Sequence, residues 1–172
     1  IGREIAFALA EDGWQVAVHY NDSSVDADKV VQEISAAGGT AISLPADLTD
    51  ESAVAAMIPA IADQLGPVTG VVNNASIFEE DSVLSATKQT WDSHMAVNLR
   101  APFLLMQSLA ENLPSNEKAN IINIIDQRVE NLTPHFTSYT VSKSALWTLT
   151  QTAAAALAPN IRVNAIGPGP TL

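Results

Sequence analysis

The sequence predicts an α/β domain in which helices cover both faces of a doubly wound parallel sheet. Segments with apolar residues at helical spacing alternate with short apolar runs along the chain. The short runs are continuously apolar, which is typical of parallel strands that are buried on both faces. The 172 residues fit a single domain, residues 1–172, and 47% hydrophobic content suffices for a substantial core.

Capping residues mark the ends of the expected elements. Gly13 ends the first helix, and a Gly-Gly pair ends the second, which begins at a serine. A Thr-Asp pair begins the third helix. The expected helices cover residues 1–12, 23–39, 49–66, 87–113 and 138–158, and the expected strands cover 14–20, 40–48, 68–75, 119–125 and 161–166.

The composition excludes several classes of function. Without cysteine there are no disulfides, thiolate nucleophiles or Cys-based zinc sites, and we expect no metal site. Eight Lys and Arg against nineteen Asp and Glu give a net charge of −11, which disfavours nucleic acid and anionic membranes as partners. No apolar run is long enough to span a bilayer and no export signal begins the chain. A cytoplasmic location is therefore expected.

Polar and small residues follow the predicted strands. In doubly wound sheets the ligand binds beyond the carboxyl ends of the strands, where small residues let it approach the backbone closely. These positions hold His19, Tyr20, Asn21 and Ser23 after the first run, Asp47 after the second, Asn74, Ala75 and Ser76 after the third, Asp126 after the fourth, and Pro168, Gly169 and Thr171 after the fifth.

The chain opens inside a helix with no strand before it. Gly2 fits the last glycine of a phosphate-binding loop at the start of that helix. We therefore expect a window of a longer chain of about 250 residues, without its first strand and its C-terminal part.

Several motifs in order resemble the short-chain dehydrogenase/reductase family over the whole chain. They are "NNAS" at 73–76, Asn98 within a long helix, "YTVSK" at 139–143 and "LAPNIRVNAIGPG" at 157–169. The resemblance implies a Rossmann-like fold, a nicotinamide cofactor and hydride transfer. It also implies that Lys143 holds the nicotinamide ribose and that Asn98 anchors a water in a proton relay.

Tyr139 and Lys143 are the expected catalytic pair. At positions i and i+4 they share one helix face, so the ammonium is expected near the phenol. A nearby ammonium, joined by the positive nicotinamide of the oxidised cofactor, favours the phenolate and lowers a phenol pKa from its usual value near 10. Tyr139 is then expected to protonate the atom that becomes basic when the hydride arrives.

Asp126 departs from the family pattern, which usually has a serine thirteen residues before the tyrosine. A carboxylate accepts hydrogen bonds but does not donate them, and it repels a developing alkoxide. Pteridine reductases and the similar dihydromonapterin reductases place Asp here and reduce C=N bonds with NADPH. Within "NNASIF" the same resemblance implies that Ser76 contacts cofactor and pterin and that Phe78 stacks on the pterin ring.

Other interpretations of these residues stay open. Asp126 also fits a structural role, as a cap at the end of the strand or as a partner of Arg128. In that case the protein would be a generic ketone or 3-oxoacyl-thioester reductase, or a catalytically silent nucleotide-binding relative. If Phe78 serves only to pack against neighbouring side chains, it does not stack on a pterin ring. His19, His94 and His135 do not cluster, and they fit surface positions or satisfied core positions.

The stretch "VHYNDSS" favours NADP over NAD. NAD-preferring members place an acid directly after this strand, whereas here His19, Tyr20 and Asn21 stand there and Ser23 is suited to phosphate. Asp22 opposes this choice unless it faces solvent. The resemblance implies adenine contacts from Asp47 and Leu48, a cofactor contact from Thr171, and a homotetramer formed through the helix at 87–113 and the helix bearing Tyr139.

Overall fold

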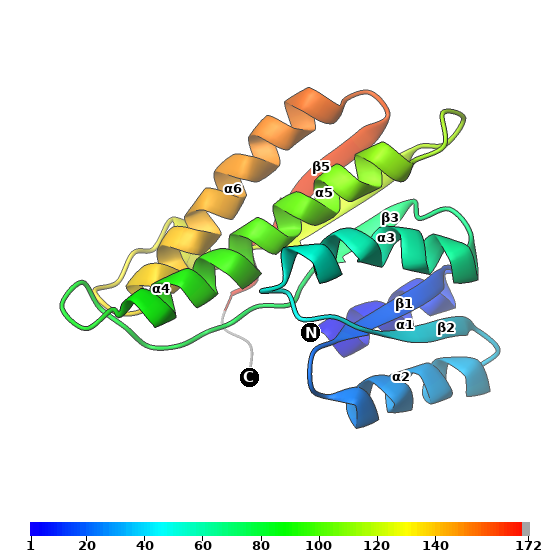
Figure 1. Cartoon of the computed structure of the whole chain (residues 1–172), viewed down its shortest axis with the longest axis horizontal. Helices are drawn as coiled ribbons and strands as arrows, with labels where there is room; N and C mark the ends of the chain where they lie inside the picture. Colours follow the sequence, from blue (N-terminus) through cyan, green and yellow to red (C-terminus); the bar gives the residue numbers. More distant parts are fainter. Residues whose placement is uncertain (170–172) are drawn as a thin grey trace. The chain divides into compact units, whose positions relative to one another are not determined.

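The structure, a computed structural model, describes residues 1–169, and its chain divides into two units after Gly66. In the first unit two parallel strands alternate with three helices (Figure 1). Strand β1 pairs with β2 from Gln15 opposite Thr40 to Tyr20 opposite Pro45. The elements are α1 (Gly2–Glu11), β1 (Gln15–Tyr20), α2 (Ser24–Ala36), β2 (Thr40–Pro45) and α3 (Glu51–Leu65).

Apolar side chains from α1, β1 and α2 form the core of the first unit. Ala6, Val16, Val30 and Ile34 are buried together there. Helices α1 and α2 bury apolar side chains against the strands in this core, and helical burial of this kind supplies most of a helix's stability. The parallel β-α-β arrangement expected for this half of the chain is confirmed.

In the second unit three parallel strands lie in the order β3-β4-β5. Buried residues of α5, β4, α6 and β5 form its core, including Leu109, Ile121, Leu146 and Val163. The elements are β3 (Gly70–Asn73), α4 (Lys88–Met95), the π-helical turn η1 (Ala96–Arg100), α5 (Ala101–Asn112), β4 (Ala119–Ile124), the 3₁₀ turn η2 (Gln127–Val129), α6 (Thr137–Leu157) and β5 (Ile161–Ile166).

The long helix expected over 87–113 forms as α4, η1 and α5 in succession, and it runs beside α6 (Figure 1). Thr87 and Thr90 form a capping box at its start. The π-helical turn was not expected, and it contains Asn98. Such turns interrupt the regular hydrogen-bond pattern and occur frequently at functional sites.

No helix in the described part of the chain is long and apolar enough to cross a membrane.

Candidate active site

Asp126, Tyr139 and Lys143 meet at the carboxyl end of β4. Helix α6 carries Tyr139 and Lys143 one turn apart, and their side chains are 6% and 2% exposed. The Tyr139 hydroxyl donates to Asp126 Oδ2 at 2.9 Å. Lys143 Nζ donates to the Ile124 carbonyl at 2.8 Å and lies 5.7 Å from the centre of the Tyr139 ring. The structure thus brings together the three residues that the sequence separates by up to seventeen positions.

Asp126 acts both as a cap and as the partner of Tyr139. Its Oδ1 accepts the backbone N–H of Arg128 at 2.8 Å and so begins η2. The Arg128 guanidinium lies over aromatic rings, with Cζ 4.8 Å from the centre of Phe136 and 5.2 Å from that of Phe78. The capping interpretation is therefore correct for one carboxylate oxygen, and the other oxygen faces the phenol.

The pKa of Tyr139 is raised above its usual value, opposite to the expectation from the sequence. Burial is the largest cause, followed by the hydrogen bond to Asp126 and the negative charge of that carboxylate. The positive charge of Arg128 opposes the shift. Lys143 by itself does not lower the pKa as expected, because the Tyr139 hydroxyl is hydrogen-bonded to Asp126 while Lys143 donates to the Ile124 carbonyl. Tyr139 is consequently held as a protonated donor across neutral pH.

Lys143 is an almost fully buried cation. Burial lowers its pKa to about 8, and the negative charge of Asp126 opposes the shift. An ammonium has three N–H donors, and among the described residues Lys143 gives one of them to the Ile124 carbonyl. The remaining donors suit the two hydroxyls of a ribose, so the residue fits the cofactor role that the resemblance implies.

Asn98 fastens the segment that follows β3. Its Oδ1 accepts the Ile77 N–H at 2.9 Å and the Ser76 hydroxyl at 3.1 Å. Its Nδ2 donates to the Ile77 carbonyl at 3.0 Å and to Ser142 Oγ at 3.2 Å. These bonds use the full capacity of a carboxamide. Because the side chain has no free donor or acceptor, only the backbone of Asn98 is left to contact a relay water.

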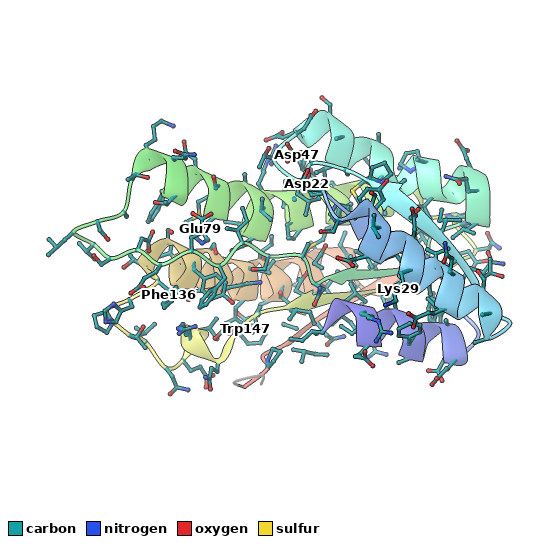
Figure 2. The ribbon with its side chains drawn as sticks, turned by 90° about the horizontal axis from the view of Figure 1, so that it is seen from below. Asp22, Lys29, Asp47, Glu79, Phe136 and Trp147 are labelled. Atoms are coloured by element: carbon teal, nitrogen blue, oxygen red, sulfur yellow. The ribbon has the colours of Figure 1, made fainter. Side chains whose placement is uncertain are left out.

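Phe78 lies next to Tyr139 and is 51% exposed. Its ring stacks on Phe136 with centres 4.3 Å apart and planes 4° apart, and it meets the Tyr139 ring edge-on at 4.7 Å. Figure 2 labels Phe136 at the start of α6. Phe78 is thus part of an aromatic group beside the phenol and also remains accessible, which a core residue does not.

Two sets of hydrogen-bonded, buried polar residues were not expected from the sequence. Asn73 Nδ2 donates to Asn123 Oδ1, and Asn123 Nδ2 donates to Thr150 Oγ1, each at 2.8 Å, which ties β3, β4 and α6 together. The second set is Asp81, His94 and Ser138. No local pattern marks residues that meet across 57 positions of sequence. His94, expected on the surface or satisfied in the core, is completely buried with partners for both ring nitrogens.

The candidate cofactor residues of the first unit gather at the carboxyl ends of β1 and β2. Figure 2 shows Asp22 and Asp47 near one another at this edge. Asn21 Nδ2 donates to Asp22 at 2.8 Å, both side chains are exposed, and the Ser23 hydroxyl makes no capping bond to α2. His19 and Tyr20 end β1, and Asn21 and Ser23 follow it directly. Asp47 and Leu48 follow β2, and Gly2 is the first residue of α1.

Asp47 and His19 are partly engaged within that edge. The backbone and hydroxyl of Thr49 both donate to Asp47 Oδ1 at 2.8 Å, and they lower the pKa of this carboxyl. His19 Nε2 lies 2.9 Å from the Ala46 carbonyl. These contacts fix the turn after β2, whereas the Asn21 and Ser23 side chains are exposed.

The remaining candidates follow strands of the second unit. Asn74, Ala75 and Ser76 follow β3, and Pro168 and Gly169 follow β5. A Cβ built at Gly167 would lie 3.5 Å from the Ile125 side chain and 3.9 Å from the backbone of Asp126, so the segment after β5 lies close to Asp126. Thr171 lies outside the described residues.

Comparisons with known proteins agree with this geometry. A family model described as short chain dehydrogenase matches residues 1–172. The 3-oxoacyl-[acyl-carrier-protein] reductase FabG of Staphylococcus aureus strain Mu50 is 35% identical over 170 residues, which cover 98% of this chain and 69% of the relative. The crystal structure of FolM alternative dihydrofolate reductase 1 from Brucella suis in complex with NADP is 44% identical, with TM-score 0.91, over 99% of this chain and 70% of that one. The corresponding NADP complex from Brucella canis is 43% identical, with TM-score 0.94 and the same coverage.

Proposed function

The chain belongs to the short chain dehydrogenase family, and from this premise we propose that it is an NADPH-dependent reductase of a C=N bond in a pterin-type ring. The observation that carries the proposal is the 2.9 Å hydrogen bond from the Tyr139 hydroxyl to Asp126 Oδ2. A carboxylate at this position suits a substrate that presents N–H donors, and it disfavours a ketone whose oxygen becomes an anion.

The protein's own residues manage the proton of this reaction. When bound, the reduced nicotinamide supplies the hydride that adds to the ring carbon of the C=N bond. The Tyr139 hydroxyl gives its proton to the ring nitrogen, which takes the electron pair of the C=N bond. Lys143 offsets the charge left on the phenolate, and Asp126 accepts from a substrate N–H. Solvent then reprotonates Tyr139, so that each turnover consumes one hydride and one proton.

Phe78 is the proposed platform for the planar substrate. Its ring is half-exposed beside Tyr139, and the stack with Phe136 supports it from one side. Aromatic stacking adds roughly 0.5 to 1.5 kcal/mol beyond the burial of area. Ser76, which follows β3 and bonds to Asn98, completes the proposed contacts to substrate and cofactor.

NADP is the proposed cofactor, with NAD a weaker alternative. Asp22 was the one residue that opposed NADP, and its side chain is exposed and hydrogen-bonded to Asn21. Asp22 therefore faces solvent, which is the condition under which the sequence is compatible with NADP. The Brucella relatives crystallised with NADP support the same choice.

Reduction of a 3-oxoacyl thioester is the second candidate, and the 35% identity to FabG favours it. Oxidation of NADPH, followed by its absorbance, separates the candidates when a dihydropterin and then an acetoacetyl thioester are supplied to the purified protein. We expect turnover of the pterin. Turnover of the thioester alone would overturn the pterin proposal, and NADPH binding without turnover of either would identify a catalytically silent relative.

A homotetramer is proposed through the helices α4–α5 and α6. A groove of about 880 Å³ lies along them, and its lining is mainly apolar, with Met95, Leu99, Phe103 and Leu149. Apolar and aromatic lining of this kind is typical of the buried centre of an interface between subunits. Light scattering on the wild type and on Leu149→Glu tests the assembly. A tetramer that the substitution dissociates supports the proposal, and a wild-type monomer contradicts it.

A further inference from the structure

Helix α6 begins without a capping side chain of its own. Its N-cap residue, Phe136, has φ 59° and ψ 47°, in the left-handed region that non-glycine residues rarely occupy. The Phe136 side chain makes no capping bond. The first N–H groups of a helix have no partner within it and must find acceptors elsewhere. The helix that carries Tyr139 therefore depends on another segment for its start.

Asp81 supplies those acceptors from the loop between β3 and α4. Its carbonyl accepts the Phe136 N–H at 2.7 Å and the Thr137 N–H at 3.4 Å. Its Oδ1 accepts the Ser138 N–H at 3.0 Å, and Oδ2 accepts the Ser138 hydroxyl. Asp81 is only 3% exposed. A negative charge is favourable at this end of a helix, and its hydrogen bonds are stronger than those between neutral groups.

His94 extends this contact to α4. The Glu79 N–H donates to His94 Nε2 at 3.2 Å, so the proton of the neutral ring resides on Nδ1. Nδ1 lies 2.8 Å from both the Thr90 carbonyl and Ser138 Oγ. The single Nδ1–H is shared between the Thr90 carbonyl and the Ser138 hydroxyl oxygen, and that hydroxyl itself donates to Asp81. The buried set is thus fully hydrogen-bonded, and it joins the loop at 79–81 to α4 and α6.

The same three residue types serve as a nucleophilic triad in other enzymes, but the arrangement here is different. The Ser138 hydroxyl donates to the carboxylate and not to the histidine. Ser138 and His94 are both 0% exposed, so neither reaches a substrate. The set is therefore a support and not a second catalytic centre.

We infer that Asp81 is a positioning residue, which holds the first turn of α6 so that the Tyr139 hydroxyl stays against Asp126. Ser138, its partner, directly precedes Tyr139. The segment that ends at Asp81 also carries Phe78, whose ring contacts both Phe136 and Tyr139. One carboxylate therefore sets the phenol relative to its acid partner and to the aromatic platform. The kinetic part of its test depends on the proposed function, whereas the spectroscopic part does not.

The kinetic test compares Asp81→Ala with Asp81→Asn, which keeps an acceptor for the Ser138 N–H. Asp50→Ala is the matched control, because Asp50 also caps a helix, α3, through the Ser52 and Ala53 N–H groups and is not among the candidate site residues. We expect Asp81→Ala to lower kcat about tenfold or more with KM for NADPH within about twofold, since small displacements at a reacting group cost this much. Asp81→Asn should recover part of kcat, and Asp50→Ala should keep all of it.

The spectroscopic test follows ionisation of Tyr139 by ultraviolet absorbance in a Tyr20→Phe background, where Tyr139 is the only tyrosine. In the parent, no tyrosinate should form while the native fold persists, because burial and Asp126 raise the Tyr139 pKa. Adding Asp81→Ala should bring ionisation toward the native pH range, because the phenol is no longer held against Asp126, and adding Asp81→Asn should do so to a smaller extent. If the Asp81 variants lower only the thermal midpoint, with kcat and the tyrosine titration unchanged, the inference is wrong. If Asp81→Ala does not fold, the kcat and the tyrosine titration of Asp81→Asn, compared with those of the parent, test the inference in the same way.

Discussion

The Tyr139 hydroxyl donates to Asp126 Oδ2 at 2.9 Å, and this carboxylate also caps η2 through the Arg128 N–H. The acid thus faces the phenol with one oxygen and fixes its own position with the other. A phenol held in this way stays protonated until a substrate or a nearby charge changes its environment. The proposed choice of a pterin-type substrate rests on this relationship.

Replacing Asp126 by serine should lower pterin reduction at least about tenfold, because the charged carboxylate that pairs with the phenol and accepts from the substrate N–H is lost. Asp126→Asn is the matched variant, since its carbonyl oxygen retains the cap on Arg128 N–H. Steady-state rates of NADPH oxidation with a dihydropterin measure both. Unchanged activity in Asp126→Ser would show that the acid serves only as a cap.

Tyr139→Phe should reduce turnover at least about a hundredfold by removing the proton donor. NADPH binding, measured by cofactor fluorescence, should persist because Lys143 and the residues after β1 are unchanged. The lost hydrogen bond to Asp126 should cost about 1 kcal/mol of unfolding free energy. Turnover within tenfold of the wild type would assign the proton to another donor.

Lys143 should make the free energy of unfolding depend on pH above about 8. Its pKa is lowered from 10.5 to about 8 in the folded chain, so between these values the unfolded chain binds more protons. Stability therefore rises with pH in this window, and below it the full cost of burying the ammonium remains. The shift corresponds to about 3 kcal/mol at most. Urea titrations at pH 7 to 10 of wild type and Lys143→Met should show this rise in the wild type only.

Phe78→Leu should raise KM for the pterin about tenfold while thermal stability changes little, because the ring is half-exposed. Phe7→Leu is a suitable control, since Phe7 also carries a guanidinium over its ring, that of Arg3, in the other unit. Initial rates over a range of pterin concentrations test both variants. Equal KM values for Phe78→Leu and wild type would show that Phe78 packs against its neighbours and does not bind the pterin.

Asp22→Asn should change NADPH binding by less than about twofold, and the remaining effect should fade at high salt, because the Asp22 carboxylate faces solvent and its charge is screened. Asp12→Asn, an exposed acid at the end of α1, is the control. Fluorescence titrations with NADPH and NADH check the result. A tightening of NADPH binding by tenfold or more, with NADH binding unchanged, would show that Asp22 faces the 2′-phosphate and opposes NADP.

The alternation of helices and strands was predictable because it depends on local periodicity. Every expected helix and strand forms within a few residues of its predicted range, and the strands pair in parallel. Tyr139 and Lys143 share a helix face by spacing alone, and Asp126 was visible as an acid that closes an apolar strand. The π-helical turn at Asn98 was not predictable, because it has no period of its own in the sequence.

The sequence by itself determined the elements, the Tyr139/Lys143 pair and the unusual acid, since each is a local pattern or a residue at a fixed distance along the chain. Only the tertiary structure decided what surrounds them. It turned Lys143 toward the Ile124 carbonyl, raised the pKa of Tyr139 through burial and Asp126, and joined Asp81 to Ser138 across 57 positions. Hydrogen bonds and burial depend on which segments pack together, and that is decided when the chain folds.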